Sequence, residues 1–158
     1  MTDPISITRV FGAPRERVWR EWTEPDRFAD WFGSAEGEVL PSSVAMDVRV
    51  GGAWRLTMRM RGGEVAWHGE YRELVEPERV VLTLSDQPSP DARHALVIVV
   101  LVEVGEGRTE MRFEQHGSLS PAQTSAARYG WSRFFDRLAE RLAAAPPQAP
   151  QRPPQMRE

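Results

Sequence analysis

The segment from Ala13 to Gly33, APRERVWREWTEPDRFADWFG, contains three of the six tryptophans in the chain. Its apolar residues recur at three- and four-residue spacing, which is typical of short amphipathic helices. We expect the first helix to begin at Pro14, where the missing N–H costs nothing, and Gly33 to close the second in a left-handed conformation. Two short helices cannot bury both apolar faces on each other, so they must pack on another layer. Those faces are Val18, Trp19 and Trp22, and Phe28, Trp31 and Phe32.

The junction between the two helices carries a capping pattern. Thr23 is expected to cap the second helix, with Asp26 three residues later as a short-armed capping box. Downstream, to about residue 116, the pattern changes to the two-residue alternation of strands, and one further strand precedes the helices. The expected strands are 5–11, 44–50, 54–60, 65–71, 79–85, 95–104 and 108–116.

The clearest hairpin joins strands 54–60 and 65–71. If Gly62 and Gly63 are its central turn residues, the register is fixed. An opposite-charge match across the strands supports this register. The hairpin should then have one aromatic and sulfur-rich face and one solvated face. The expected pairs are Met60 with Val65, Met58 with Trp67, Leu56 with Gly69 and Trp54 with Tyr71 on the first face, and Thr57 with His68 and Arg55 with Glu70 on the second.

The turn Gly105-Glu-Gly107 joins the last two strands. A two-residue turn would set Glu103 against Glu110, so a four-residue turn is preferred. Either turn places Ile98, Val100 and Val102 on the inner face with Thr109, Met111 and Phe113. The outer face would then carry Val97, Val99 and Leu101. Neighbouring long side chains such as Arg112 and Glu114 would shield this stripe, or a homodimer would bury it.

A final helix is marked by Ser120 as N-cap, Pro121 at the first helical position and Gln123 as the third member of a capping box. It is expected to run to about Ala144. Gly130 lies inside it at a cost of about 1 kcal/mol relative to alanine, which a close approach of helix to sheet would justify. The apolar stripe of this helix is Ala127, Trp131, Phe134, Phe135, Leu138 and Leu142.

The element order predicts an α+β fold. A curved antiparallel sheet of about six to seven strands would wrap around the long C-terminal helix, with two short helices after the first strand and space between sheet and helix. Residues 1–145 are expected to form one domain. The remainder, residues 146–158, is rich in proline and glutamine and is expected to be disordered.

Composition excludes several classes of function. The chain has no cysteine, so it has no disulfide framework and no thiolate metal site. All 20 basic residues are arginine, which removes Schiff-base chemistry because it needs a lysine amine. A net charge of −3 gives no support to nucleic-acid binding. No stretch has the length of a membrane span and no N-terminal run resembles a signal peptide, so we expect a cytoplasmic protein.

The motifs of catalysis are also missing from the sequence. His68, His94 and His116 lack metal-ligand spacing. The run from Gly130 to Phe134 is not a nucleophile elbow, because phenylalanine stands where the second glycine belongs. There is no phosphate loop and no dinucleotide fingerprint. We therefore predict no catalytic residue, no metal and no cofactor, and leave enzymatic activity open.

Four blocks of the chain resemble a known family. They are APRERVWREWTEPDRFADWFG, DVRVGGAWRLTMR, GEYRELVEPERVVLT and GWSRFFDRLAERL. Together they look like bacterial proteins of the heat-shock-chaperone ATPase activator type, in the START-like or birch-pollen-allergen-like helix-grip superfamily (SRPBCC). The similarity runs from about Ile5 to Leu142, with Trp31-Phe32 where family members typically carry paired tryptophans. It is specific for the fold and not for a reaction.

The resemblance implies a hydrophobic cavity between the sheet and the C-terminal helix. On pattern alone the aromatic residues would be assigned to an ordinary core. With the resemblance, some of them are expected to line a pocket, where Tyr71 and Gln115 would orient a ligand, with Arg9 and Thr109 as further candidates. The expected ligand-binding residues are Trp54, Leu56, Met58, Trp67, Tyr71, Met111, Phe113, Gln115, Trp131 and Phe134.

Three functional hypotheses remain open at this point. The first is a carrier for a small hydrophobic molecule, such as a lipid, a polyketide or an aromatic compound. The second is a cyclase- or dehydratase-like enzyme on such a substrate, which would need a buried acid or base. The third is a protein-interaction module that acts as a chaperone cofactor or regulator. The expected partner is thus a small hydrophobic molecule, with a homodimer possible and with neither nucleic acid nor a membrane span.

Overall fold

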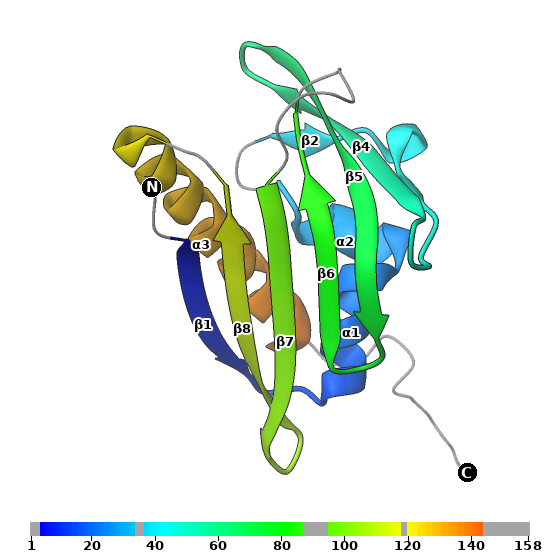
Figure 1. Cartoon of the computed structure of the whole chain (residues 1–158), viewed down its shortest axis with the longest axis vertical. Helices are drawn as coiled ribbons and strands as arrows, with labels where there is room; N and C mark the ends of the chain where they lie inside the picture. The colour runs from blue at the N-terminus through cyan, green and yellow to red at the C-terminus, as the bar shows by residue number, and fades with distance from the viewer. Residues whose placement is uncertain (1–3, 34–36, 87–94, 118–119, 144–158) are drawn as a thin grey trace, which may run out of the picture.

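The computed structural model describes residues 4–33, 37–86, 95–117 and 120–143. The tail and the end of the expected domain lie outside these residues. The described strands form one eight-stranded antiparallel sheet in the order β1-β8-β7-β6-β5-β4-β2, with β3 paired to β4 (Figure 1). The strands are β1 (Ile5–Phe11), β2 (Glu38–Val39), β3 (Ala45–Met46), β4 (Ala53–Met60), β5 (Gly63–Val75), β6 (Arg79–Leu84), β7 (Ala95–Gly105) and β8 (Arg108–His116).

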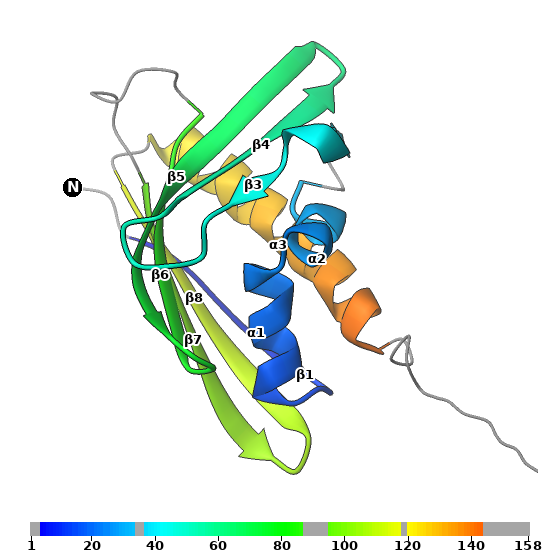
Figure 2. The ribbon, with the colours of Figure 1, turned by 90° about the vertical axis from the view of Figure 1, so that its right-hand side faces the viewer.

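The helices lie on the concave side of the curved sheet (Figure 2). They are α1 (Arg15–Thr23), α2 (Pro25–Trp31) and α3 (Pro121–Ala143), with a short 3-10 turn at Pro41–Ser43. The α+β helix-grip fold expected from the sequence is therefore confirmed. No helix in the described ranges is long and apolar enough to cross a membrane.

The ends of α1 and α2 differ in detail from the expectation. Pro14 is the N-cap of α1 and not its first helical residue. Thr23 does not cap α2, because its hydroxyl donates to the Trp19 carbonyl one turn earlier, at 2.9 Å. Gly33 does close α2 with φ 76°. A Cβ there would also collide with the Met58 sulfur, so the glycine lets the end of α2 rest on β4.

The register of the β4–β5 hairpin differs from the expected one by two residues. Met60 pairs with Gly63, Met58 with Val65, and Trp54 with Gly69, so the turn is Arg61-Gly62. A shift of two leaves every side chain on its expected face. Accordingly, Met58 is buried, and Trp54 and Trp67 lie on the same face.

The observed register is explained by the space that Gly69 leaves for an indole ring. The Trp54 Nε1 donates to the Thr83 carbonyl at 3.0 Å, across the glycine. A Cβ at position 69 would collide with that same carbonyl oxygen and crowd the indole nitrogen. The expected register, in contrast, would have opposed the two large rings of Trp54 and Tyr71. The proposed match of Arg55 with Glu70 is replaced by Arg55 with His68.

The β7–β8 hairpin reverses the expected faces of β7. Val97, Val99 and Leu101 are the buried residues, and they pair with Gln115, Phe113 and Met111 on β8. Ile98, Val100 and Val102 lie on the outer face instead, with intermediate exposure. The expected assignment of this stripe to the outer face is therefore wrong, because the stripe is part of the core and offers no surface to a homodimer.

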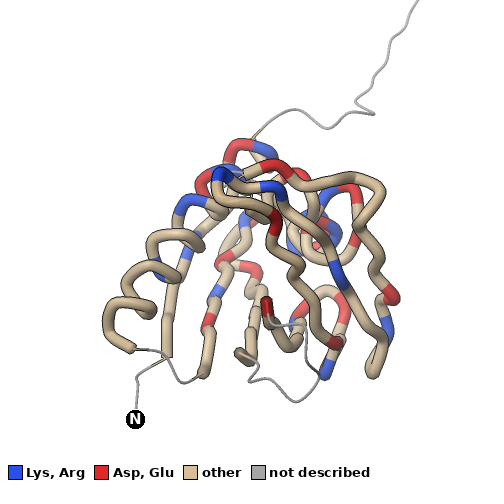
Figure 3. Tube along the Cα trace, turned by 90° about the horizontal axis from the view of Figure 1, so that it is seen from above, with Lys and Arg blue, Asp and Glu red and all other residues tan. Residues whose placement is uncertain are grey.

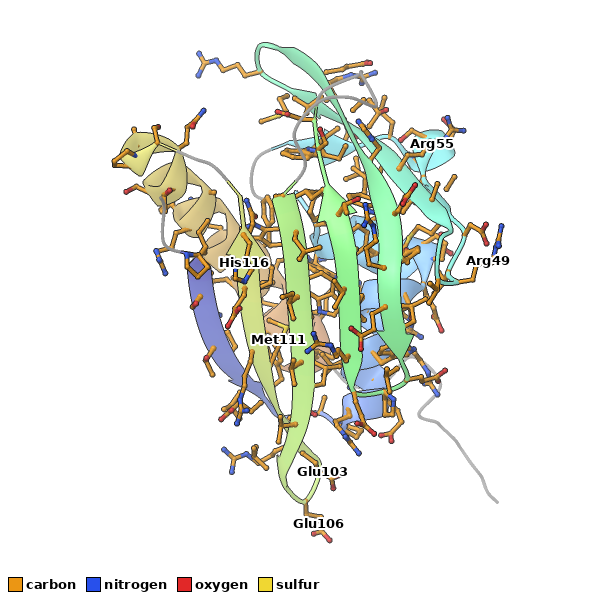
Figure 4. The ribbon with its side chains drawn as sticks, viewed as in Figure 1. Arg49, Arg55, Glu103, Glu106, Met111 and His116 are labelled. Carbon is orange, nitrogen blue, oxygen red and sulfur yellow. The ribbon has the colours of Figure 1, made fainter. Side chains whose placement is uncertain are left out.

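A β-bulge is the physical cause of this reversal. The register shifts between Glu103 and Gly105, near the end of the hairpin where Glu103 and Glu106 are labelled in Figure 4. One extra residue in a strand exchanges its two faces. Turns of two or four residues without a bulge would have kept the expected faces.

The expected capping box of α3 is present. The Gln123 N–H donates to the Ser120 hydroxyl at 3.1 Å, and the Ser120 N–H donates to the Gln123 Oε1 at 2.9 Å. All buried residues of α3 lie between Trp131 and Leu142, and none lies in its first ten residues. Gly130 stands at the boundary, and a Cβ there would meet no atom of the described residues within 4 Å. The expected close approach of helix to sheet at Gly130 is therefore wrong.

Replacing Gly130 with alanine should raise the free energy of unfolding by about 0.5–1 kcal/mol, because the helix gains propensity without a steric conflict. Urea unfolding of the two proteins measures the difference. Gly107→Ala is a matched control, since that site is equally free of contacts but has φ 70°. The control should lose stability. A destabilised Gly130→Ala would show that this position contacts part of the protein.

An ionic network fastens the second half of α3 to α1 and α2. Glu21 of α1 is 1% exposed, and its two carboxylate oxygens accept from Arg141 of α3 at 2.6 and 3.2 Å. Arg141 and Arg137 both donate to Asp30 of α2. Arg17 donates to the last carbonyls of α3. In Figure 3, acidic and basic positions lie close together at the C-terminal end of α3.

Candidate ligand-binding site

Phe32 lies at the centre of the aromatic cluster between the sheet and α3. Its ring centroid is 6.0 Å from those of both Trp54 and Trp67, 5.6 Å from Trp131 and 5.4 Å from Phe134. It therefore joins the hairpin wall to the helix wall. From the sequence, Phe32 was assigned to the apolar face of α2 and was not included among the expected ligand-binding residues. The sequence signal that could have identified Phe32 as a site residue was its position directly before Gly33, which ends α2.

Further rings extend the cluster toward β8. Phe113 lies 4.5 Å from Trp131, and Trp22 lies 6.4 Å from Phe113 and 6.3 Å from Trp131, by ring centroids. Phe135 completes the contacts with Phe113 and Trp131. These separations are those of rings in direct contact. The middle of the interior is thus filled, and a ligand would have to lie beside this cluster.

The ten expected ligand-binding residues all belong to the inner walls of the fold. The strand residues share the face of β4, β5 and β8 that looks toward α3, and Met111 is labelled on β8 in Figure 4. All are buried except Trp67, which is half-buried. Tyr71 makes no ring contact with the cluster in the described structure and lies farther along β5.

Three of the four polar candidates have partners within the protein. The Trp131 indole donates to the Gln115 Oε1 at 2.6 Å. The Thr109 hydroxyl donates to the Ala13 carbonyl at 2.7 Å. Arg9 donates to the Ser132 carbonyl at 3.0 Å and forms an ion pair with Asp136 at 2.9 Å. These contacts give Arg9 and Thr109 a structural role that ties strands to helices.

Tyr71 is different, because its hydroxyl is buried and has no hydrogen-bond partner in the described structure. Burial, together with the nearby charge of Asp47, raises the pKa of Tyr71 well above its ordinary value. The phenol therefore stays protonated and remains a hydrogen-bond donor across the physiological pH range. Trp67 Nε1 and Trp22 Nε1 are likewise buried without a partner.

Replacing Tyr71 with phenylalanine should increase stability at neutral pH by about 1 kcal/mol, because the variant no longer buries an unpaired hydroxyl. The raised pKa adds a second effect. A folded-state pKa above the unfolded value of about 10 means that the wild type loses stability as pH rises beyond that value. The Tyr71→Phe variant should lose less stability than the wild type over the same rise in pH. Urea titrations at neutral and alkaline pH measure both effects, with Tyr129→Phe on the surface as control. Identical pH profiles for Tyr71→Phe and the wild type would contradict this.

Trp67 is the least covered of the ten expected ligand-binding residues, and Gly130 of α3 has free space beside it. The indole of Trp67 contacts Phe32 on its inner side but is only partly covered. The position of a Cβ on Gly130 is open space with respect to the described residues. Thr124, on the first half of α3, also has a buried hydroxyl without a partner. Trp67 and Gly130 are therefore the candidate positions at which a ligand could reach the inner walls.

The described residues do not assemble a metal site or an acid–base pair on the inner face. No group of three or more potential metal ligands occurs among them. His116 lies outside, where it pairs with Glu114 at 2.8 Å. His68 lies on the outer face of β5, as expected, and His94 is outside the described residues. On the inner walls, the chemistry is that of aromatic surface with a few hydrogen-bond donors.

Comparison with known proteins connects this fold to a family. The family described as "Activator of Hsp90 ATPase homolog 1-like protein" matches residues 12–143. A protein of Chromobacterium violaceum is 26% identical, with a TM-score of 0.81, over 92% of this chain and 100% of its own. A Rhizobium leguminosarum protein is also 26% identical, with a TM-score of 0.72, over 89% of this chain and 93% of its own.

A more distant structure carries a functional description. It is a Plasmodium falciparum protein described as an HSP90 activator, 18% identical with a TM-score of 0.70, and it covers 88% of this chain and 95% of its own. At that identity the likeness concerns the fold alone. No curated protein sequence matches the chain significantly.

Proposed function

The chain belongs to the activator of Hsp90 ATPase homologue 1-like family, and on that premise we propose that it binds and carries a small hydrophobic molecule between its sheet and α3. Helix-grip folds of this kind typically bind hydrophobic ligands. The observation that carries the proposal is the half-buried Trp67, which faces the aromatic cluster on one side while open space adjoins Gly130 on α3. An exposed aromatic surface beside a deep apolar wall favours an apolar guest.

Titration with an environment-sensitive apolar dye tests this proposal. The wild type should bind the dye, and Trp67→Ala should weaken binding about tenfold, by loss of one aromatic wall of the site. Tyr129→Ala is the matched control, because it removes an aromatic side chain of α3 that is 61% exposed. The control should bind like the wild type. Absence of dye binding to the folded wild type would contradict the carrier function.

Native mass spectrometry of the purified protein gives an independent measurement. A carrier should retain a small molecule through gentle purification, and the added mass would identify its class. The released compound should then displace the dye from the wild type. A compound that co-purifies but does not displace the dye would place its binding site elsewhere.

The second candidate is a protein-interaction module that regulates a chaperone. The family description and the likeness to the Plasmodium falciparum protein favour it. The measurement is the ATPase rate of a purified Hsp90-type chaperone with and without this protein, with a heat-denatured sample as control. An unchanged rate at saturating concentration would contradict this candidate. The enzyme hypothesis has less support, because Tyr71, the titratable group of β5 on the inner wall, stays protonated and so offers no base.

A further inference from the structure

The interior contains hydrogen-bond donors that the fold leaves unpaired. Other donors of the interior are satisfied: Trp31 donates to the Glu21 carbonyl at 2.9 Å and Trp54 to the Thr83 carbonyl at 3.0 Å. The Trp67 indole and the Tyr71 hydroxyl have no such partner in the described structure. A buried donor without a partner costs about 1–3 kcal/mol. Two of them on the inner wall are a feature that packing alone does not explain.

These two donors belong to the same wall. Trp67 and Tyr71 are four residues apart on β5, so both point to its inner face. At about 3.3 Å per residue their backbone positions are roughly 13 Å apart. Gly69 lies between them, with the Trp54 indole seated over it. Trp22, the third unpaired indole, is enclosed by five neighbouring rings and is not available to a guest.

Charge on the inner walls is the second part of the argument. The inner residues of β4, β5, β6 and β8 are uncharged. Arg9, the charged side chain of this face on β1, is already paired with Asp136. An anionic guest would therefore lose its hydration without gaining a counter-ion on these walls, which is strongly unfavourable, and the charge of Asp47 near Tyr71 would disfavour it further. Aromatic rings supply most of the surface, and they favour a flat aromatic partner.

We propose that the ligand is an uncharged, planar aromatic molecule with carbonyl or ether oxygens, and that Trp67 and Tyr71 donate hydrogen bonds to those oxygens. This inference rests on the carrier function proposed above. It selects aromatic ketones, quinones and aryl ethers over fatty acids, whose carboxylate would be unpaired, and over saturated hydrocarbons, which accept no hydrogen bond. Trp67 and Tyr71 are thus specificity-determining residues.

A matched pair of probes tests the inference by calorimetry. The probes are 2-acetylnaphthalene and 2-ethylnaphthalene, which have nearly the same size and differ in the carbonyl oxygen. The ketone should bind the wild type about tenfold more tightly, the range of one neutral hydrogen bond to a buried donor. The single carbonyl of this probe can reach only one of the two donors, so either Tyr71→Phe or Trp67→Phe should remove the preference. The double variant should bring the ratio of the two affinities to about one.

Controls separate the inference from the function on which it rests. Tyr129→Phe should keep the full preference for the ketone, since Tyr129 is exposed. Equal affinity of the wild type for both probes would overturn the proposed selectivity while the carrier function stands. Binding of neither probe, together with absence of dye binding, would overturn the carrier function itself. Tyr71→Phe keeps the shape of the side chain, so loss of the fold should not obscure the result.

Discussion

Replacing Phe32 with alanine is expected to lower the free energy of unfolding by about 3–5 kcal/mol, as for other fully buried phenylalanines. Phe32 is 2% exposed and touches rings from α2, β4, β5 and α3. Its removal leaves a cavity at the point where the hairpin wall meets the helix wall. The surrounding structure relaxes only partly around such a cavity, which adds to the loss. Urea unfolding followed by tryptophan fluorescence measures the loss.

Two further variants test whether the loss of stability in Phe32→Ala comes from the buried volume of this ring. Phe32→Leu keeps most of the volume and should cost less than half as much as alanine. Tyr129→Ala removes a ring of α3 that is 61% exposed and should change stability little. A loss below about 1 kcal/mol for Phe32→Ala would contradict a central role for this ring. The cluster would then be organised around its tryptophans.

The helices, strands and apolar faces were predictable because their signals are local. The capping box at Ser120 and Gln123 specifies the start of α3 within a few residues of chain. Strict alternation in β4 specifies which side chains face inward, whatever strand lies opposite. The inner position of Trp54, Met58 and Trp67 could thus be inferred before their partners were known. The fold class followed from the order of these elements.

The predicted register of the β4–β5 hairpin and the predicted inner face of β7 were wrong, because contacts distant in the sequence determine them. The hairpin turn could use either pair among Arg61, Gly62 and Gly63, and local preference does not choose between them. The choice depends on the fit of Trp54 over Gly69 against Thr83 of a third strand. The predicted inner face of β7 was wrong for a similar reason. A bulge near Glu103 exchanges the inward and outward side chains of the strand, and no marked sequence signal indicates it.

The candidate site was predicted in its walls but not in its centre. Strand alternation and the stripe of α3 identified the residues that face inward. They could not show that Phe32 would join them, because the face of α2 has no partner in the sequence alone. Glu21 was also missed, although it lies three residues after Val18 on the apolar face of α1. A charged residue on such a face indicates a buried ion pair, and this signal could have found it.

Replacing Glu21 with alanine should also cost about 3–5 kcal/mol, the usual loss when one partner of a buried ion pair is removed. Its carboxylate accepts from Arg141 at 2.6 Å and from Arg27 at 3.4 Å, while only 1% of its side chain is exposed. The hydrogen bond to Glu21 is the largest cause that raises the pKa of Arg141. Without Glu21, Arg141 is left mostly covered, with Asp30 as its remaining partner.

The same network supplies a matched control for this substitution. Glu24 also pairs with Arg27, at 2.6 Å, but its side chain is 49% exposed. Because exposed ion pairs contribute little, Glu24→Ala should cost about 0–1 kcal/mol. A double-mutant cycle with Arg141→Met should give a coupling energy of about 1–3 kcal/mol, since the second substitution removes the guanidinium that loses its buried partner in Glu21→Ala. Equal losses for Glu21→Ala and Glu24→Ala would show that the burial of Glu21 adds nothing to the stability of the fold.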